Sequence, residues 1–148
     1  MSVALSLCRI ALALTLAFAA QAHAAEVGQI KTVRGQVAID RQGKTVPAVV
    51  GTRLQQSDTV TTGGDGSVGI TMDDDSLLSA GPNSSLSVDQ YAFDPATNRG
   101  RLVTSLNKGT LAVISGRIAK QSPDAMTVRT PSAILGVRGT EFVVSAND

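Results

Sequence analysis

Apolar and polar residues alternate over short segments through most of the chain, and this pattern predicts β-strands. The clearest alternation lies at residues 67–72, where three apolar residues are separated by Ser67, Gly69 and Thr71. No window after residue 24 has sustained helical periodicity. The pattern therefore predicts one all-β domain of short antiparallel strands, arranged as a β-sandwich or as a short solenoid-like stack. Further strands are expected at residues 29–34, 36–41, 51–54, 59–62, 77–78, 86–88 and 126–129.

Gly, Pro and Asn mark the turns between these strands. Gly63-Gly64-Asp65-Gly66 predicts a hairpin turn, and Pro47 is expected to end a third short strand. Residues 102–106 and 110–115 are expected to form a hairpin that is joined through residues 107–109.

Two segments lack the alternation and are expected to be irregular. Residues 91–100 contain Pro95, Asn98 and Gly100, and they are expected to form the longest irregular excursion of the chain. Residues 117–124 are polar and end in a Ser-Pro-Asp sequence. Residues of these types are typical of connections between strands.

Residues 130–142 are expected to form the closing strand, against which earlier strands pack. Pro131 suits the start of a strand or an edge, because it has no N–H to donate. Gly136 and Gly139 interrupt the apolar pattern. Glycine within a strand often marks a bulge, so a β-bulge is expected near Gly139.

Side-chain parity supports this bulge. Val137 and Phe142 are an odd number of positions apart, so an unbroken strand would point them to opposite faces. One inserted residue would place Val137 on the same face as Phe142 and Val144. Arg138 would lie beside the kink, and a covered guanidinium needs an acceptor. The candidates for that acceptor are Glu141, Asp58 and Asp75.

Residues 1–24 have the features of a cleavable, helical secretory signal peptide, which would leave residues 25–148 as the folded domain. Arg9 supplies positive charge, residues 10–20 are apolar, and Ala22-His23-Ala24 is a cleavage site of the A-x-A kind. The apolar run is shorter than the roughly 20 residues that span a bilayer. We expect export and no stable membrane span after cleavage, with an uncleaved membrane anchor as the alternative.

Removal of the signal peptide changes the inventory of reactive groups. Cys8 and His23, the single Cys and His, would leave with it, so disulfides, Cys or His zinc sites and Ser-His-Asp or Cys-His catalytic sites are excluded. Because Arg9 is the one charged residue removed, the remaining 124 residues carry 12 Lys and Arg against 12 Asp and Glu. A neutral chain with three aromatic residues does not suggest a nucleic-acid partner.

Few candidates for chemistry remain, and neither catalytic residues nor a cofactor are predicted. Asp73, Asp74 and Asp75 could bind calcium, but the spacing of a calcium loop is absent and a solvated turn is favoured. Adjacent carboxylates also do not face each other as a glycosidase pair does. Arg138-Gly139-Thr140 could be an exposed recognition loop. A structural role is favoured there, and replacing Gly139 by Val should then lower stability.

Three motifs give the chain a resemblance to the FecR-like periplasmic domain. Residues 51–54 with 58–63, and residues 106–109 with 115–118, resemble two earlier motifs of that family. Together with the closing motif they cover nearly all of the chain after residue 26, and they imply the same all-β class. The closing motif has the pattern Thr130-Pro131-x-Ala133-x-x-Gly136-x-Arg138-Gly139-Thr140-x-Phe142.

FecR-like domains are best known as the periplasmic part of transmembrane regulators. These receive a signal from an outer-membrane receptor and pass it to a cytoplasmic sigma factor. This chain departs from that plan, because no cytoplasmic segment precedes the apolar run and the sequence stops six residues after Phe142. The resemblance therefore implies a free-standing exported domain that does not signal across the inner membrane by itself.

The first function predicted is a periplasmic module that binds another protein of the Gram-negative envelope, through β-strand addition at an exposed edge. The alternatives are a binder of cell-wall or extracellular polysaccharide, a self-associating structural protein, and a part of an envelope signalling system. The lack of Trp after the leader weighs against sugar stacking. The oligomeric state and the choice between periplasmic and extracellular destinations stay open. Arg138 is the one candidate binding residue.

Overall fold

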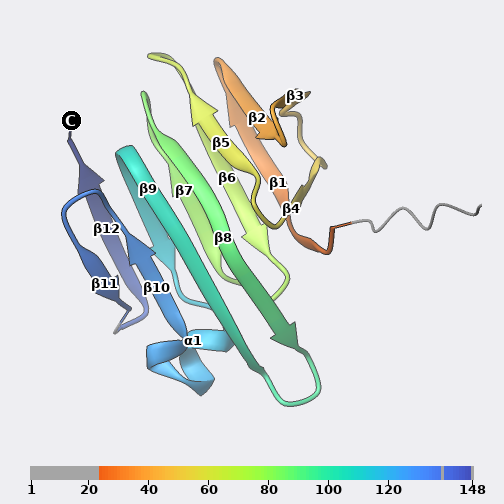
Figure 1. Ribbon diagram of the computed structural model, residues 1–148, viewed down its shortest axis with the longest axis vertical. Helices are drawn as coiled ribbons and strands as arrows, with labels where there is room; N and C mark the ends of the chain where they lie inside the picture. The colour runs from red at the N-terminus through yellow and green to blue at the C-terminus, as the bar shows by residue number, and fades with distance from the viewer. Residues whose placement is uncertain (1–23, 138, 148) are drawn as a thin grey trace, which may run out of the picture.

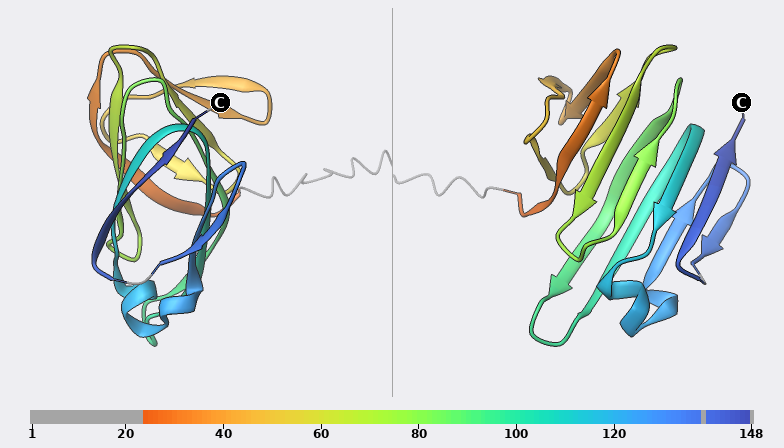
Figure 2. Two further views of the ribbon diagram at one scale, coloured as in Figure 1. Left: turned by 90° about the vertical axis from the view of Figure 1, so that its left-hand side faces the viewer. Right: turned by 180° about the vertical axis from the view of Figure 1, so that it is seen from behind.

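The computed structural model describes residues 24–137 and 139–147, which form an all-β structure with one short α-helix. Twelve strands join into a single sheet that curls into two facing layers (Figure 1). The layers are seen edge-on in the left view of Figure 2. The expected all-β class is confirmed, and its arrangement is a curled, sandwich-like sheet.

Each layer contains a set of neighbouring strands, and the long strand β9 belongs to both. The first layer holds β4 (Arg53–Gln55), β1 (Glu26–Arg34), β6 (Ser67–Met72), β7 (Leu77–Ala80), the second part of β9 (Arg99–Ile114) and β12 (Glu141–Ala146). The second layer holds β3 (Lys44–Pro47), β2 (Val37–Arg41), β5 (Thr59–Thr62), β8 (Ser85–Asp94), the first part of β9, β10 (Met126–Arg129) and β11 (Ile134–Gly136). Among the described strands, the pairing of β10 with β9 is parallel and the others are antiparallel.

The core lies between the two layers and is built by the alternation seen in the sequence. In β6, Val68, Ile70 and Met72 are buried, whereas the residues between them are partly exposed. Inward-facing side chains of both layers join the same apolar cluster. Burying one such side chain contributes about 1.5–3 kcal/mol, so the strand pattern itself specifies which face of each strand turns inward.

The prediction of a hairpin at residues 102–106 and 110–115 is wrong, because residues 99–114 form the single strand β9. Gly109 has φ +93°, and the strand passes at this point from the second layer to the first. A Cβ at Gly109 would collide with Ser84, so a side chain is excluded there. Neighbours on both sides hold β9 extended, which outweighs the local turn tendency of residues 107–109.

The prediction of an irregular excursion at residues 91–100 is also wrong. The segment is the end of a β8–β9 hairpin, in which Tyr91 lies opposite Leu102. Only residues 95–98 form the turn, and the Asp94 carboxylate caps it by accepting a hydrogen bond from Ala96 N at 2.9 Å. Local Asx bonding explains how a segment with Pro and Asn makes a tight turn here.

Residues 117–124, expected to be irregular, contain the helix α1 (Arg117–Gln121) and the start of a 3-10 turn at Pro123–Ala125. Ile118 and Ala119 are buried on its inner side at one end of the sandwich. A five-residue helix gives too few turns for a periodic signal. Within the described residues, no helix is long and apolar enough to cross a membrane.

The closing segment is not one strand with a bulge. β11 lies in the second layer and β12 in the first, so the two parts of the expected strand belong to different layers. Val137 and Val144 are nevertheless both buried, and Phe142 packs against the core, as parity required. The placement of β11 and β12 in different layers, rather than an inserted residue, accounts for the inward position of these side chains.

Candidate interaction surface

The two layers end at two flanks, where each outer strand has one neighbour among the described strands. The C-terminal flank consists of β11, which pairs with β10, and β12, which pairs with β9. The N-terminal flank consists of β3, which pairs with β2, and β4, which pairs with β1. The two flanks lie on opposite sides of the molecule (Figure 1).

Half of the backbone polar groups of β12 point away from β9. The two strands are antiparallel along all of β12. Just before β12, Ser115 N donates to Thr140 O at 2.8 Å, which fixes the residues that exchange hydrogen bonds with β9. Such residues alternate along an antiparallel pair. The N–H and C=O groups that point outward at the sheet edge therefore belong to Glu141, Val143 and Ser145.

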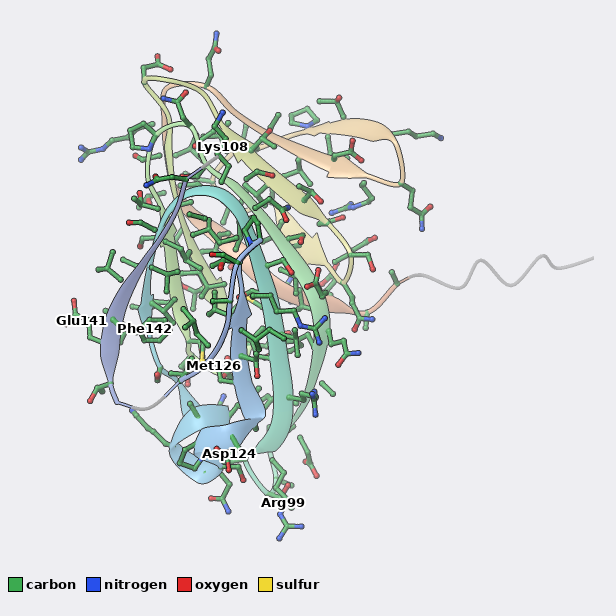
Figure 3. The ribbon with its side chains drawn as sticks, turned by 60° about the vertical axis from the view of Figure 1, so that its left-hand side comes forward. Arg99, Lys108, Asp124, Met126, Glu141 and Phe142 are labelled. Carbon is green, nitrogen blue, oxygen red and sulfur yellow. The ribbon has the colours of Figure 1, made fainter. Side chains whose placement is uncertain are left out.

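The side chains of these three residues lie on the outer face of the first layer. Val143 is 67% exposed, whereas Val144, on the other face, is 6% exposed. Figure 3 shows Glu141 and Phe142 leaving β12 in opposite directions, with Phe142 turned inward. The edge thus combines backbone groups that have no strand partner among the described residues with one exposed apolar side chain at its centre.

An apolar strip on the outer face leads to this edge. Leu77 of β7 lies opposite Ile114 of β9, and their exposed fractions are 39% and 40%. Val143 lies opposite Ala112 in the next row. A strand added beside β12 would extend the strip and cover Val143.

β11 adds apolar side chains to the same flank. Ile134 is 72% exposed and Leu135 is 38% exposed. The strand follows a tight turn in which Thr130 N donates to Ala133 O at 2.8 Å and Ala133 N donates to Thr130 Oγ1 at 3.1 Å. The three-residue length of β11 makes it a poorer template for a new strand than β12.

The residues of the closing motif have different surroundings. Gly136 and Gly139 face open space, and Gly139 has φ +113°, a conformation that favours glycine. Arg138 lies outside the described residues, so its expected roles stay predictions. Two of its expected acceptors are paired with other arginines, since Asp58 contacts Arg41 at 2.7 Å and Asp75 contacts Arg117 at 3.0 Å.

The N-terminal flank is shorter and is tied down. β3 has four residues and ends at Pro47, and β4 has three. The loop between them continues along β1, because Gly51 N donates to Ile30 O at 2.8 Å and Ile30 N donates to Thr52 O at 2.9 Å. Short strands and Pro are devices by which natural sheet edges resist pairing.

A part-buried ion pair lies beneath this flank. Asp58 is 1% exposed, and its carboxylate accepts hydrogen bonds from Arg41 Nε at 3.0 Å and Nη2 at 2.7 Å. The hydrogen bond to Asp58 raises the pKa of Arg41 above its ordinary value. Gln55 N also donates to Asp58, at 2.9 Å, so the carboxylate joins β2 to β4.

The acidic turn at Asp73–Asp75 differs from the solvated turn expected for it. Asp74 is fully buried, and its Oδ2 accepts hydrogen bonds from Ser76 Oγ at 2.8 Å and Ile118 N at 3.2 Å. Asp73 pairs with Arg53, and Asp75 pairs with the Arg117 side chain. The Asp75 contact lies off the Nε–H direction, so it is electrostatic rather than a hydrogen bond.

These carboxylates do not converge on one point. Each has its own protein partner, and Asp74 anchors the start of α1. Within the described residues, no group of three or more His, Cys, Asp or Glu is placed to hold a metal ion. The segment at residues 63–66 is a turn, closed by Gly66 N donating to Gly63 O at 3.0 Å.

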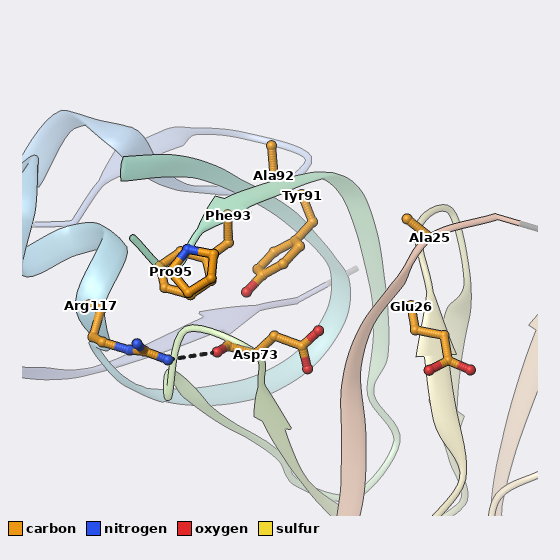
Figure 4. Close-up of a pocket in the computed structure, with 8 residues that line it drawn as sticks. All are labelled: Ala25, Glu26, Asp73, Tyr91, Ala92, Phe93, Pro95 and Arg117. Carbon is orange, nitrogen blue, oxygen red and sulfur yellow. Dashed lines mark hydrogen bonds between the residues drawn. The ribbon is translucent and has the colours of Figure 1, made fainter. Parts of the chain in front are cut away.

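A pocket of about 310 Å³ lies at the end of the sandwich near α1 (Figure 4). The Arg117 guanidinium lies 4.7 Å from the centroid of the Phe93 ring, and its Nη2 donates to Asp73 O at 3.1 Å. Among the described residues, no group meets hydrogen-bond geometry with the buried Tyr91 hydroxyl. Burial raises the pKa of Tyr91, and the charge of Asp74 adds to this effect. The lining residues are Ala25, Glu26, Asp73, Tyr91, Ala92, Phe93, Pro95 and Arg117.

Comparison with protein families gives a match between the FecR protein family and residues 58–148, more than half of the chain. The chain belongs to the FecR family. This is a non-enzymatic family of envelope signalling and regulation, whose domain is typically periplasmic. Comparisons with curated proteins and with solved structures gave no match. All of the C-terminal flank lies within the matched residues, whereas β3 and β4 precede them.

Sequence reasoning did not identify β12 as an outer strand of the part of this FecR protein that the structure describes. A signal was present, because residues 141–146 contain no Pro, Lys or Arg. The strand neighbours that decide which strand is at an edge come from residues far apart in the chain, as in the pairing of β9 with β7, β8, β10 and β12.

Proposed function

We propose that this FecR protein is a non-enzymatic periplasmic module that binds another cell-envelope protein by β-strand addition at β12. The observation that carries the proposal is the free, six-residue edge whose alternate N–H and C=O groups point outward. An added strand obtains affinity from main-chain hydrogen bonds and specificity from alternate side chains. Val143 and the apolar strip behind it would supply this specificity.

The character of the edge supports this proposal. Natural sheet edges are usually protected by Lys, Pro, bulges or short length. β12 has six residues, contains no Lys or Pro, and pairs with β9 without a register shift. An unprotected edge in an exported protein is a liability unless a partner uses it. Export through the expected signal peptide would bring the domain to the compartment where envelope partners are found.

A photo-reactive amino acid placed at position 143 tests the proposal in living cells. Val50, which is 64% exposed on the N-terminal flank, is the matched control position. We expect one dominant envelope protein to be captured from position 143 and not from position 50. Equal capture from both positions, or none from position 143, would contradict strand addition at β12.

Polysaccharide binding is the second candidate, and the pocket near α1 is the observation that favours it. Tyr91 and Phe93 line this pocket beside the carboxylates of Glu26 and Asp73. Aromatic rings next to polar groups are suited to a sugar ring. Cosedimentation with purified cell-wall material tests this function: loss of binding in Phe93→Ala, with no loss in Val143→Ser, would assign binding to the pocket.

A further inference from the structure

We propose that β12 also pairs with β12 of a second copy of this chain, antiparallel and centred on Val143. The two copies would form a two-fold symmetric dimer in which the first layer continues from one copy into the other. The proposal begins from the outward-pointing groups of Glu141, Val143 and Ser145, which must be the residues that bond an added strand.

The register follows from these groups. With Val143 opposite Val143 of the second copy, Glu141 lies opposite Ser145 of the second copy, and the reverse pair completes the ladder. Each of these three pairs exchanges two main-chain hydrogen bonds. The Ser145 hydroxyl can donate to the opposing Glu141 carboxylate. The Glu141 carboxylate of each copy therefore lies opposite a hydrogen-bond donor and not opposite another carboxylate.

Other two-fold registers fit less well. A pairing centred on Glu141 places the two carboxylates directly opposite each other, which is destabilising. A pairing centred on Ser145 leaves Glu141 without an opposite residue and shortens the ladder. Centring on Phe142 or Val144 brings the outward groups of only two residues of each strand opposite each other, so the ladder has two bonded pairs instead of three. The Val143-centred register therefore gives the longest bonded ladder within β12 without placing like charges opposite each other.

Side-chain packing supports the same centre. On the outer face, the row Ala112–Val143 would continue into the same row of the second copy and cover both exposed valines. On the inner face, Phe142, which is only partly buried, would lie opposite Val144 of the second copy. The contact is one strand wide, and small interfaces of this kind are typical of transient association.

Self-pairing would regulate partner binding, and this consequence rests on the proposed function. The outward groups of β12 cannot bond two strands at once. A partner strand would therefore have to displace the second copy, and dimerisation would mask the edge until a partner competes for it. The self-pairing itself can be tested in purified protein, without any partner.

Mass measurement across a concentration series gives the first test. The full chain, expressed with its own N-terminal segment and purified, is measured by light scattering between about 1 μM and about 1 mM. We expect the mass to double as the concentration rises. Val143→Pro removes the central edge N–H and should stay monomeric with an unchanged circular dichroism spectrum. A wild-type protein that stays monomeric over the whole range, or a Val143→Pro variant that dimerises equally, would overturn the proposal.

Cysteine crosslinking tests the register, in a background that carries Cys8→Ser. We expect Val143→Cys to form a disulfide dimer under mild oxidation, because the two-fold axis passes beside this residue and opposed strand residues lie within disulfide range. Glu141→Cys and Ser145→Cys should crosslink when the two variants are mixed, but neither with itself. Val50→Cys should stay uncrosslinked. Efficient self-crosslinking of Glu141→Cys, or equal crosslinking of Val50→Cys, would overturn the Val143-centred pairing.

Discussion

The two flanks of the sandwich differ in how well their outer strands are protected from pairing with another chain. On the N-terminal flank the outer strands are short, β3 ends in Pro47, and Arg53 is held by Glu26 and Asp73. On the C-terminal flank β12 has six alternating residues and no protecting Lys or Pro. Both flanks expose a valine to a similar degree, 64% for Val50 and 67% for Val143.

This difference teaches that exposure alone does not make a binding surface. Val50 lies in a loop whose neighbours bond β1, so no row of free backbone groups accompanies it. Val143 lies at the centre of such a row. Strand addition requires both the row and the side chain, because main-chain bonds supply affinity and side chains supply selectivity. The matched FecR region contains the flank that has both.

The largest expected effect comes from placing proline at neighbouring positions of β12. Val144→Pro removes an N–H that bonds β9 and should lower the free energy of unfolding by about 3 kcal/mol. Val143→Pro removes an N–H that points to solvent and should cost less than about 1 kcal/mol. Urea denaturation of both variants checks whether the N–H groups of β12 point alternately toward β9 and toward solvent. Similar costs at the two positions would mean that β12 is not a free edge.

Asp58→Asn tests how the N-terminal flank is held. It removes a charge that is 1% exposed and leaves Arg41 without its partner, so we expect a loss of about 3 kcal/mol in unfolding free energy. Glu26→Gln, at an exposed pair with Arg53, should cost less than about 1 kcal/mol. Thermal and urea unfolding of the two variants provide the comparison. Equal losses would show that the buried pair does not anchor this flank.

Tyr91 at the end of the sandwich gives a measurement that is independent of both flanks. Its pKa is raised above the ordinary value of about 10, because burial disfavours the phenolate. Stability from the neutral phenol is complete below pH 10 and is lost as pH rises through the raised pKa, since the unfolded chain ionises first. The chain has one Tyr and no Trp, so phenolate absorbance reports this residue alone.

Tyr91→Phe is the matched variant for that titration. It removes a buried hydroxyl for which the described residues provide no well-aligned hydrogen-bond partner, so stability at neutral pH should be unchanged or rise by up to about 1 kcal/mol. The loss of stability above pH 10 should become shallower. A Tyr91 that ionises at its ordinary pKa while the protein stays folded would contradict the burial described for its hydroxyl.

The smallest effect on folding is expected for Val143→Ser and Val50→Ser. Both side chains are exposed, so each change should alter the free energy of unfolding by less than about 0.5 kcal/mol. Only Val143→Ser should reduce self-association, because only Val143 lies on the β12 edge. Sedimentation of both variants at equal concentration checks this difference. Equal behaviour would remove the functional distinction between the flanks.

Short-range patterns in the sequence predicted much of the fold. Residues 59–62, 67–72 and 126–129 form strands with the expected bounds, because alternation and flanking turns are local signals. The sequence failed where tertiary contacts override local tendency. Residues 107–109 resemble a turn, yet strand neighbours on both sides of β9 keep them extended.

The candidate surface was harder to predict than the fold. The closing motif drew attention to residues 130–142, and among them to its glycines and Arg138, rather than to β12. Burial of Asp74 was missed because three adjacent Asp residues look solvated unless the position of α1 is known. Edges and buried charges both depend on which distant segments meet.

Amide hydrogen exchange along β12 tests the central claim, that this strand has a free edge, most directly. In dilute protein we expect the amides of Val143 and Ser145 to exchange quickly and those of Val144 and Ala146 to be protected by β9. At high concentration the Val143 and Ser145 amides should become protected as edges pair. Protection of Val143 equal to that of Val144 in dilute protein would contradict the account, because it would mean that the edge is already covered within one chain.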